Sequence, residues 1–359
     1  MKETLAIGLM SGSSLDGLDL ALVSFTSDQG HYTYTIKEAA TLPYPEVWRA
    51  KLANAFQSNP EDLGPLDREY GAYLGQQVKR FVEQCGITPD FVASHGHTIF
   101  HQPEKRYTLQ IGDGQALADQ CGLLTVNDFR SEDVSKGGQG APLVPIGDRL
   151  LFNDYDICLN IGGIANLSYE YQGKRIAYDI CIANQALNWL AQREGLSYDK
   201  DGMMARKGTL NQALLDKLNS HAFYGQLPPK SLGREFFETF QRQLLESHNT
   251  ADALATFTEH IAMQIAQCTA QLSEGTILIT GGGARNTYLV ERIQQHTKHQ
   301  VVIPDSQTID YKEALIFALL GLLRLEGNTN VLCSVTGAPT DSCSGRIWIP
   351  KQKQHNKLV

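Results

Sequence analysis

The chain has 359 residues, which is enough for two packed domains. Its formal net charge of -8, without any run rich in lysine and arginine, argues against nucleic acid as a partner. Hydrophobic residues make up 42% and charged residues 19%, as in ordinary globular proteins. The longest apolar run, ALIFALLGLL at 314–323, is too short to span a bilayer, so no membrane partner is expected.

The cysteines and the first residues both indicate a cytoplasmic protein. Seven cysteines occur, and none forms a CxxC pair. An odd number of cysteines in so long a chain favours reduced thiols over a disulfide framework. The opening MKETLAIGLMSGSS has no long apolar stretch before its small residues, so no signal peptide is expected.

The first part of the chain opens with an apolar run, the small turn GLMSGSSLDGLD at 8–19, and a second apolar run. Together with the β-rich YTYTIKEAATL at 32–42, this pattern predicts three antiparallel strands. Apolar residues recur at helical spacing from Leu63 to Phe81 and predict a long amphipathic helix. Further strands are predicted at 91–94, 108–111 and 123–128, with a short helix over 113–120.

The stretch SEDVSKGGQGAPLVP at 131–145 is polar and rich in glycine and proline. Its composition leaves two interpretations open, a linker between domains or a loop that closes over a ligand.

The second part repeats the opening theme. DICLNIGGIANLSYEY at 156–171 again has a strand, a glycine turn and a strand, and RIAYDI at 175–180 adds a third strand. A third glycine turn lies in TILITGGGARNTYLVERI at 276–293, where a strand leads into a helix, and VVIP is a short strand. Two similar halves predict a duplicated α/β architecture around a central cleft. Helices are predicted at 184–194, 209–219, 234–246, 251–273 and 312–326.

The glycine turns are suited to phosphate binding. The first is not a Walker A loop, because no GK[ST] follows, and it is not the dinucleotide fingerprint, because a strand comes next. Small residues let backbone N–H groups approach an anion, and a nearby aspartate can orient hydrated Mg²⁺. One glycine hairpin is more often only a tight turn, whereas three glycine turns favour a phosphate site.

Eleven segments together resemble the anhydro-N-acetylmuramic acid kinase family. They are GLMSGSSLDGLD, HGHT, LQIGDG, DFR, GGQGAPLVP, LNIGGIANL, YDKDG, PPKSLGRE, TGGGARN, EALIFALLG and SVTGA, between residues 8 and 338. The resemblance implies a two-domain actin-like ATPase (ribonuclease H-like) fold, with duplicated mixed sheets and flanking helices around a central cleft. The first domain would comprise 1–130 plus about 311–345, and the second 131–310.

The resemblance also implies an activity. The family uses ATP to phosphorylate 1,6-anhydro-N-acetylmuramic acid while water opens the internal bridge of the sugar. The product is N-acetylmuramic acid 6-phosphate, in the recycling of peptidoglycan. The family further suggests a homodimer.

The resemblance assigns roles to individual residues. Asp179 would accept the proton of the attacking water, although the residues alone favour a cap on the helix that begins near Asn184. Arg130 would face the lactyl carboxylate, and Glu313 would reach the sugar or only decorate the first turn of its helix. ATP would be held by Gly12, Ser13, Ser14, Leu15, Asp16, Gly17, Leu18, Asp19, Gly162, Gly163, Gly281, Gly282 and Gly283, with Asp16 orienting the water shell of Mg²⁺. The sugar would contact His97, Thr98, Asp128, Arg130, Gln139 and Glu313.

One segment departs from the family pattern. The family usually has Asp-Thr-Gly-Pro-Gly-Asn where this chain has DICIAN at 179–184. Larger side chains there would hinder close approach of the backbone to a ligand. A kinase of a related amino sugar or anhydrosugar therefore stays open as an alternative. A non-catalytic ATP-binding clamp of the chaperone type is a third hypothesis.

Two sequence patterns suggest metal binding instead. His95, His97 and His101 form HxHxxxH, and alternation would place His95 and His97 on one face of a strand, as in some metallohydrolases. No further ligand at a recognisable spacing completes that set, so a metal site is disfavoured. YDKDG at 198–202 resembles the start of an EF-hand, but Met203 and Leu210 occupy ligand positions and exclude it.

Overall fold

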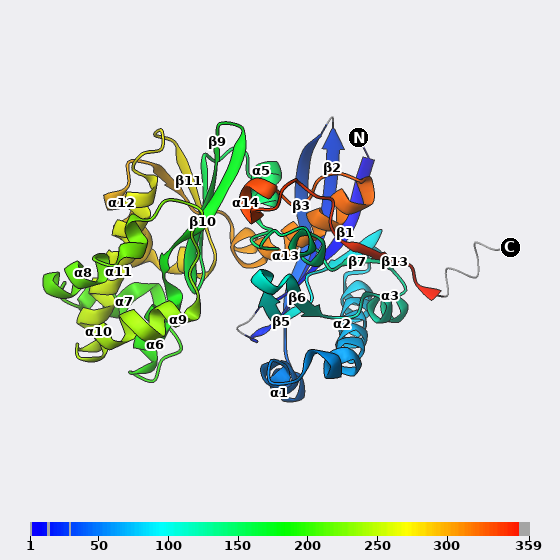
Figure 1. Cartoon of the computed structure of the whole chain (residues 1–359), viewed down its shortest axis with the longest axis horizontal. Helices are drawn as coiled ribbons and strands as arrows, with labels where there is room; N and C mark the ends of the chain where they lie inside the picture. Colours follow the sequence, from blue (N-terminus) through cyan, green and yellow to red (C-terminus); the bar gives the residue numbers. More distant parts are fainter. Residues whose placement is uncertain (1, 13–14, 29, 352–359) are drawn as a thin grey trace. The chain divides into compact units, whose positions relative to one another are not determined.

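The computed structural model describes residues 2–12, 15–28 and 30–351. Ser13 and Ser14, which were assigned to the ATP site, lie outside the described residues. The chain divides into two compact units, Met1–Leu151 with Tyr311–Val359, and Phe152–Asp310 (Figure 1). Residues 131–151 thus belong to the first unit, whereas the expected domain boundary lay before residue 131. The exact bounds of the two expected domains stay a prediction.

The sheet of the first unit begins with the antiparallel meander that the sequence predicts. It has the strand order β13-β7-β4-β1-β2-β3. β4 and β7 run parallel to β1 on its other side, and β13 pairs antiparallel with β7. The strands are β1 (Lys2–Ser11), β2 (Gly17–Asp28), β3 (His31–Pro43), β4 (Phe91–Ser94), β7 (Leu124–Asn127) and β13 (Arg346–Trp348). β5 (His97–Gln102) and β6 (Tyr107–Ile111) form a separate two-stranded sheet.

The helices of the first unit follow from their apolar spacing. α2 (Gly64–Cys85) buries Tyr70, Leu74, Val78 and Phe81 along one face, which confirms the amphipathic helix. The other helices are α1 (Glu46–Ala55), α3 (Gly114–Cys121), α4 (Ser131–Ser135), α5 (Pro145–Leu151), α13 (Ser306–Glu326) and α14 (Cys333–Thr336).

α13 lies directly against the backbone of β1. A Cβ atom added at Gly8 would lie 1.7 Å from the carbonyl oxygen of Ala314, so only glycine fits at this position. α13 begins at Ser306, earlier than the predicted start at residue 312.

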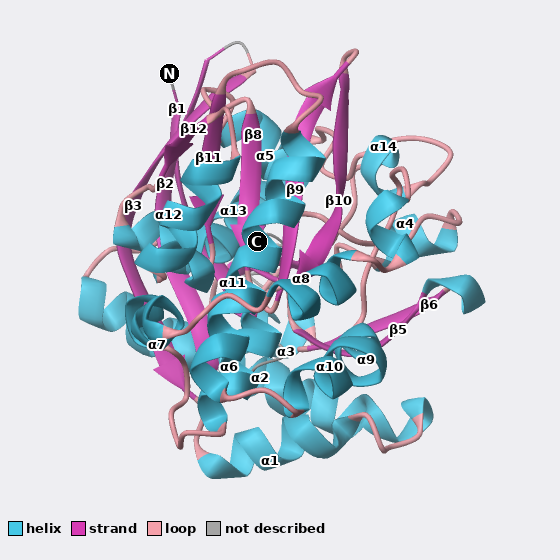
Figure 2. Ribbon diagram, turned by 90° about the vertical axis from the view of Figure 1, so that its left-hand side faces the viewer, coloured by secondary structure: helices cyan, strands magenta, loops and turns pink. Residues whose placement is uncertain are grey.

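The second unit repeats the strand order of the first. Its sheet has the order β10-β9-β8-β11-β12, with an antiparallel meander followed by two parallel strands. The apolar runs of the central strands are buried, and Figure 2 shows β8 and β11 side by side. The strands are β8 (Ile157–Ile161), β9 (Ile164–Tyr171), β10 (Lys174–Ile182), β11 (Thr276–Thr280) and β12 (Gln300–Val302). The predicted α/β class with duplicated mixed sheets is confirmed.

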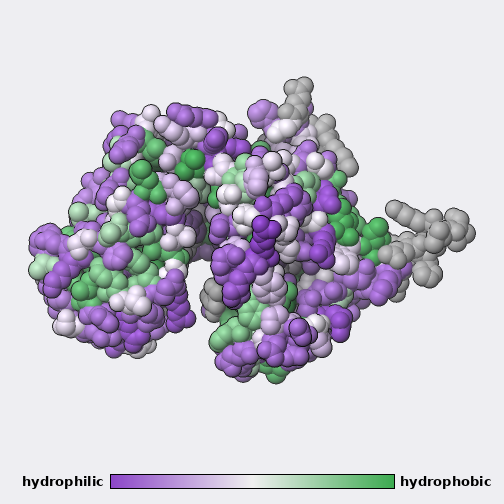
Figure 3. All heavy atoms as spheres, in the orientation of Figure 1, coloured by the Kyte–Doolittle hydropathy of each residue, from purple (hydrophilic) through white to green (hydrophobic). Residues whose placement is uncertain are grey.

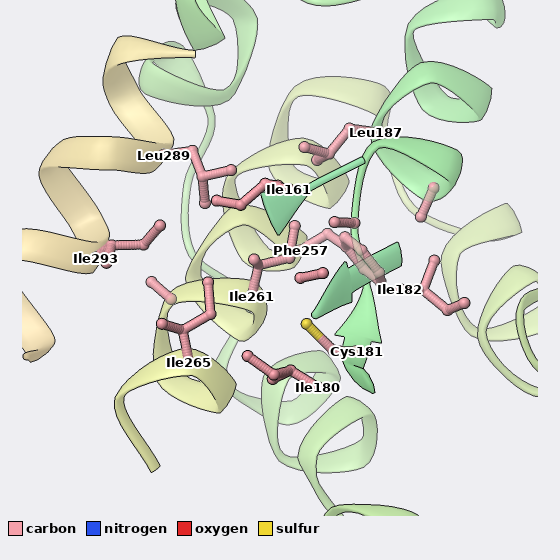
Figure 4. Close-up of a cluster of buried hydrophobic side chains, with 14 of the residues drawn as sticks. Ile161, Ile180, Cys181, Ile182, Leu187, Phe257, Ile261, Ile265, Leu289 and Ile293 are labelled. Atoms are coloured by element: carbon pink, nitrogen blue, oxygen red, sulfur yellow. The ribbon is translucent and has the colours of Figure 1, made fainter. Parts of the chain in front are cut away.

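Helices pack on this second sheet, mainly through α11 (Thr250–Thr269). Phe257, Ile261 and Ile265 on α11 belong to the buried core together with Ile161 and Ile182 of the sheet (Figure 4). The helix predicted over 234–246 is present without a gap as α9, a π-helical turn at Phe237–Gln241, and α10. The other helices are α6 (Asn184–Gln192), α7 (Met203–Lys207), α8 (Gln212–Asn219), α9 (Arg234–Phe236), α10 (Arg242–Glu246) and α12 (Thr287–His296).

The surface is mixed in character. On the face drawn in Figure 3, hydrophilic residues predominate and hydrophobic ones form small areas. Across the described part of the chain, every helix is too short or too polar to traverse a lipid bilayer.

Candidate active site

The first glycine turn connects β1 to β2. Leu15 adopts a left-handed conformation with φ of 59°, and its N–H donates to the oxygen of Gly12 over 3.4 Å. Asp16 is exposed at the end of this turn. Asp19 is already inside β2, where its carboxylate accepts a hydrogen bond of 2.6 Å from the Thr41 hydroxyl. Asp16 is therefore the more accessible aspartate of the turn.

The HGHT segment contains a sharp bend. β4 ends at Ser94, Gly96 has φ of +73°, and β5 begins at His97. The prediction that His95 and His97 share a strand face is wrong, because the left-handed Gly96 interrupts the chain between them. His95 lies beyond the end of β4, outside any strand, and His97 begins β5 of the two-stranded sheet. Among the described residues, no group of three His, Cys, Asp or Glu side chains could hold a metal ion.

Arg130 ties three of the sequence motifs together. Its Nε and Nη2 both donate to Nε2 of His95, over 3.1 and 2.9 Å, and its Nη1 donates to the oxygen of Gly140 over 2.6 Å. Burial lowers the pKa of Arg130 to about 10, while the Glu313 carboxylate opposes this shift. Burial and the adjacent Arg130 charge hold the pKa of His95 well below its usual value, so His95 is neutral at pH 7.

Glu313 belongs to the same electrostatic environment. Desolvation raises the pKa of its carboxyl, Arg130 lowers it, and Asp19 of the glycine turn raises it further. α13 begins at Ser306, so Glu313 lies well inside the helix. The interpretation that Glu313 decorates the first turn of its helix is wrong.

The loop at 131–145 is fastened within the first unit. The buried carboxylate of Asp133 accepts hydrogen bonds from Gly140 N–H over 2.7 Å and from the Thr336 hydroxyl over 2.8 Å. The N–H of Gln139 donates to the oxygen of Thr336 over 2.8 Å, and its side chain is exposed. The linker interpretation is wrong, because the chain enters the second unit only after Leu151. Asp133 lies three residues after the DFR motif and was not among the predicted site residues.

Two of the other sugar candidates lie apart from this arrangement. Asp128 has φ of +59° and pairs with Nε of Arg346 over 3.0 Å. It lines a hollow of about 310 Å³ together with Ser131 and Arg346, whereas Arg130 points to His95. Thr98 is exposed on β5. Arg130 and Glu313 therefore interact electrostatically, whereas the described contacts of Asp128 do not join it to either residue.

In the second unit, two glycine turns meet at one edge of the sheet. β8 and β11 are parallel neighbours, so both turns follow the carboxyl ends of adjacent strands. A Cβ atom at Gly281 would lie 2.6 Å from Oδ1 of Asn160, and one at Gly283 would lie 2.2 Å from Cγ2 of Ile161. Gly282 and Gly283 belong to a 3-10 turn over Gly282–Arg285, which lies between β11 and α12.

Alanine substitutions separate structural from ligand-binding glycines. We expect Gly283→Ala to lower the free energy of unfolding by about 1–3 kcal/mol, because its methyl group would overlap Ile161. Gly163→Ala should fold normally, since the nearest atom to its Cβ is 3.8 Å away. If phosphates approach the backbone at Gly163, this variant should raise KM for ATP about tenfold. Urea unfolding and steady-state kinetics measure both effects, and an unchanged KM would contradict the phosphate role of Gly163.

Asp179 is held in place by the chain at 230–232. Its N–H donates to the oxygen of Lys230 over 3.1 Å, and its Oδ2 accepts from the N–H of Leu232 over 2.9 Å. Burial raises the pKa of the Asp179 carboxyl, and the Leu232 bond partly opposes this shift. Ala183 precedes α6, and no side chain caps that helix, so the cap interpretation of Asp179 is wrong. No sequence pattern predicted the hydrogen bond from Leu232, which lies 53 positions away.

The segment that departs from the family pattern is part of the core. Four consecutive side chains of this segment are 0% exposed and pack in the hydrophobic cluster of the second unit, namely Ile180, Cys181, Ile182 and Ala183. The first three are labelled in Figure 4. The N–H groups of Ala183 and Asn184 donate to the oxygens of Gly163 and Gly162, over 2.8 and 3.0 Å. Core packing thus accounts for the larger side chains that were expected to crowd a ligand.

The two sheets define the class of the protein. Each has the order of a ribonuclease H-like fold, in which a meander is followed by parallel strands, and the pair corresponds to the actin-like ATPase class. The sequence profile of anhydro-N-acetylmuramic acid kinases matches residues 4–350. The chain therefore belongs to the anhydro-N-acetylmuramic acid kinase family.

Individual relatives agree with this assignment. The anhydro-N-acetylmuramic acid kinase of Mannheimia succiniciproducens is 35% identical, over 97% of this chain and 100% of that protein. The enzyme of the same name from Vibrio cholerae is 36% identical, over 97% and 99% of the two chains. That from Gloeobacter violaceus is 35% identical, over 94% and 97%.

Proposed function

We propose that this protein is an ATP-dependent kinase that opens 1,6-anhydro-N-acetylmuramic acid with water and phosphorylates O6. The family match across both compact units carries this proposal. Water forms a bond to C1 as the C1–O6 bond breaks, and O6 takes the γ-phosphoryl group of ATP. The products are N-acetylmuramic acid 6-phosphate and ADP.

Asp179 is proposed as the base that removes a proton from the attacking water. Its Oδ2 is fixed by Leu232, and Oδ1 accepts no hydrogen bond within the described ranges, so Oδ1 is the atom proposed to face the water. A raised pKa makes the carboxylate a better base than an ordinary aspartate. The oxocarbenium-like C1 of the transition state needs such an aligned water.

The glycine turns are proposed to hold ATP. Gly12 to Asp19 and Gly162–Gly163 would contact the phosphates, and Gly281–Gly283 would lie against the adenosine. The exposed carboxylate of Asp16 suits an ion that keeps most of its water shell, as Mg²⁺ does. When bound, Mg²⁺ neutralises charge on the phosphates.

The sugar contacts are proposed for the first unit. Arg130 offers a cation to the lactyl carboxylate, and Glu313 lies within its electrostatic reach. The proposed set of sugar contacts is completed by His97, Thr98, Asp128 and Gln139. For Asp128 to bind the sugar, its ion pair with Arg346 would have to open.

Coupled detection of ADP with the purified chain, Mg-ATP and 1,6-anhydro-N-acetylmuramic acid tests the activity. We expect turnover with this sugar and a product that carries phosphate on O6. Turnover only with another amino sugar would replace the substrate assignment. Bound ATP without turnover on any sugar would favour the non-catalytic clamp. Light scattering would test the homodimer suggested by the family.

The pH dependence of kcat/KM follows from the Asp179 carboxyl. A general base works only when it is deprotonated, so kcat/KM falls as pH decreases through its pKa. Because burial raises this pKa, the fall should begin above the range of an ordinary aspartate, whose pKa is about 3.9. A pH–rate profile measures the acid limb. An acid limb that persists unchanged in Asp179→Asn would assign it to another group.

A further inference from the structure

Four polar side chains form a hydrogen-bonded line in the interior of the first unit. The Tyr70 and Tyr44 hydroxyls are 2.6 Å apart, and the Tyr44 hydroxyl donates to Oγ of Ser11 over 2.7 Å. Oγ of Ser11 lies 2.8 Å from Nδ1 of His97. All four side chains are buried. The line passes the start of the first glycine turn at Ser11, the last residue of β1, and ends at His97.

The direction of this line follows from counting protons. Each hydroxyl has one proton to donate. Since Tyr44 donates to Ser11, the bond between the two tyrosines uses the proton of Tyr70. Ser11 accepts from Tyr44, so its own proton is available for Nδ1 of His97. His97 then carries its proton on Nε2.

The opposite tautomer is disfavoured by the surroundings of Ser11. With the proton on Nδ1, His97 would donate to Oγ of Ser11, which would then accept from both His97 and Tyr44. The Ser11 proton would then need another acceptor. The Tyr70 hydroxyl also interacts with Ser11, but the geometry of the described residues gives Oγ hydrogen bonds to Tyr44 and His97 alone. A buried hydroxyl proton without an acceptor is costly.

The neighbouring His95 has the reverse arrangement. Its Nε2 accepts from Arg130, and its Nδ1 lies 3.0 Å from the oxygen of Gly96, to which it must donate. His95 thus carries its proton on Nδ1. Burial lowers the pKa of His97 to about 4, so both rings are neutral at pH 7 and differ in tautomer.

We propose that Tyr44 and Ser11 are positioning residues that fix His97 with its proton on Nε2, directed at an uncharged oxygen acceptor of the sugar. Nε2 of His97 has no hydrogen-bond partner among the described residues. It is also not one of the fully buried polar atoms that lack a partner there, so it is open to a ligand. A neutral N–H donor recognises a hydroxyl, ether or amide oxygen without needing an anion. The identification of this acceptor as an oxygen of the sugar rests on the proposed function. The tautomer of His97 does not depend on it.

Histidine-selective ¹⁵N NMR of the unliganded full chain tests the tautomer. We expect one ring, identified by its loss in His97→Gln, to show a protonated Nε2 and an unprotonated Nδ1. Tyr44→Phe should move both nitrogens of this ring toward intermediate shifts, because Ser11 loses its donor and both tautomers become populated. Tyr73→Phe is the matched control, since Tyr73 stacks on Tyr70 with ring centroids 6.1 Å apart but lies outside the line. A wild-type His97 protonated on Nδ1, or an unchanged spectrum in Tyr44→Phe, would overturn the proposal.

Kinetics test the connection to the sugar. Apparent affinity falls with the fraction of the competent tautomer, so Tyr44→Phe should raise KM for the sugar about 2- to 10-fold. KM for ATP and the pH profile should stay unchanged, as should all constants of Tyr73→Phe. If Tyr44→Phe alters the tautomer of His97 but leaves KM for the sugar unchanged, the proposed contact between His97 and the sugar would be contradicted. A wild-type chain without kinase activity would overturn the proposed function and leave the NMR result standing.

Discussion

Asp179→Asn is expected to lower kcat about 10²- to 10⁴-fold, which is the usual contribution of a positioned general base. The amide keeps the size of the carboxylate, and its oxygen can still accept the hydrogen bond from Leu232 N–H. The loss would therefore report the missing base rather than a displaced loop. ATP affinity, measured by calorimetry, should be retained, because Asp179 takes no part in the proposed phosphate contacts.

Asp156→Asn provides the matched control. Asp156 lies in the same unit and also accepts a backbone hydrogen bond, from Thr276 N–H over 2.7 Å. The same chemical exchange there should leave kcat within a factor of about two, since a surface change away from the site alters stability only slightly. A variant Asp179→Asn with nearly normal kcat would contradict the base assignment and favour a clamp without chemistry.

The second large effect is expected in stability. Asp133→Ala should lower the free energy of unfolding of the first unit by about 2–4 kcal/mol, because it leaves Gly140 N–H and the Thr336 hydroxyl without their acceptor. Urea unfolding followed by tryptophan fluorescence measures this loss. In a Trp189→Phe background, the two remaining tryptophans, Trp48 and Trp348, both report on the first unit.

Glu132→Ala is the control for Asp133→Ala on the same short helix. Glu132 makes an exposed ion pair with Lys136, and such pairs contribute about 0–1 kcal/mol. Equal losses in the two variants would show that the loop at 131–145 is not held by Asp133. A loss in Asp133→Ala alone would confirm that one buried carboxylate orders this loop.

Local patterns predicted most of the architecture. The two meanders and their glycine turns were predicted because buried strands and small turn residues have distinct signatures over short stretches. The π-helical turn inside the helix predicted over 234–246 was not, because apolar residues continue through Phe237–Gln241 without a distinct pattern. The position of His95 relative to His97 was predicted wrongly. The prediction assumed a continuous strand, and the left-handed conformation of Gly96 interrupts it.

The candidate site was harder to predict than the fold, because its contacts join distant parts of the chain. The bond between Asp133 and Thr336 spans 203 positions, and that between Ser11 and His97 spans 86. No periodicity links such residues before the chain is folded. The resemblance supplied the names of the proposed site residues, and the structure supplied the partners that orient Asp179, Arg130 and His97.

The contact of Gly8 with Ala314 determines how closely α13 packs on β1 in the first unit. The helix that carries Glu313 rests on bare main chain, and the strand beneath it leads to the turn that begins at Gly12. The separation of these two features is thus fixed by the absence of one methyl group. A methyl group added at position 8 would push α13 away from β1. It would thereby increase the distance between the Glu313 carboxylate and the turn that begins at Gly12.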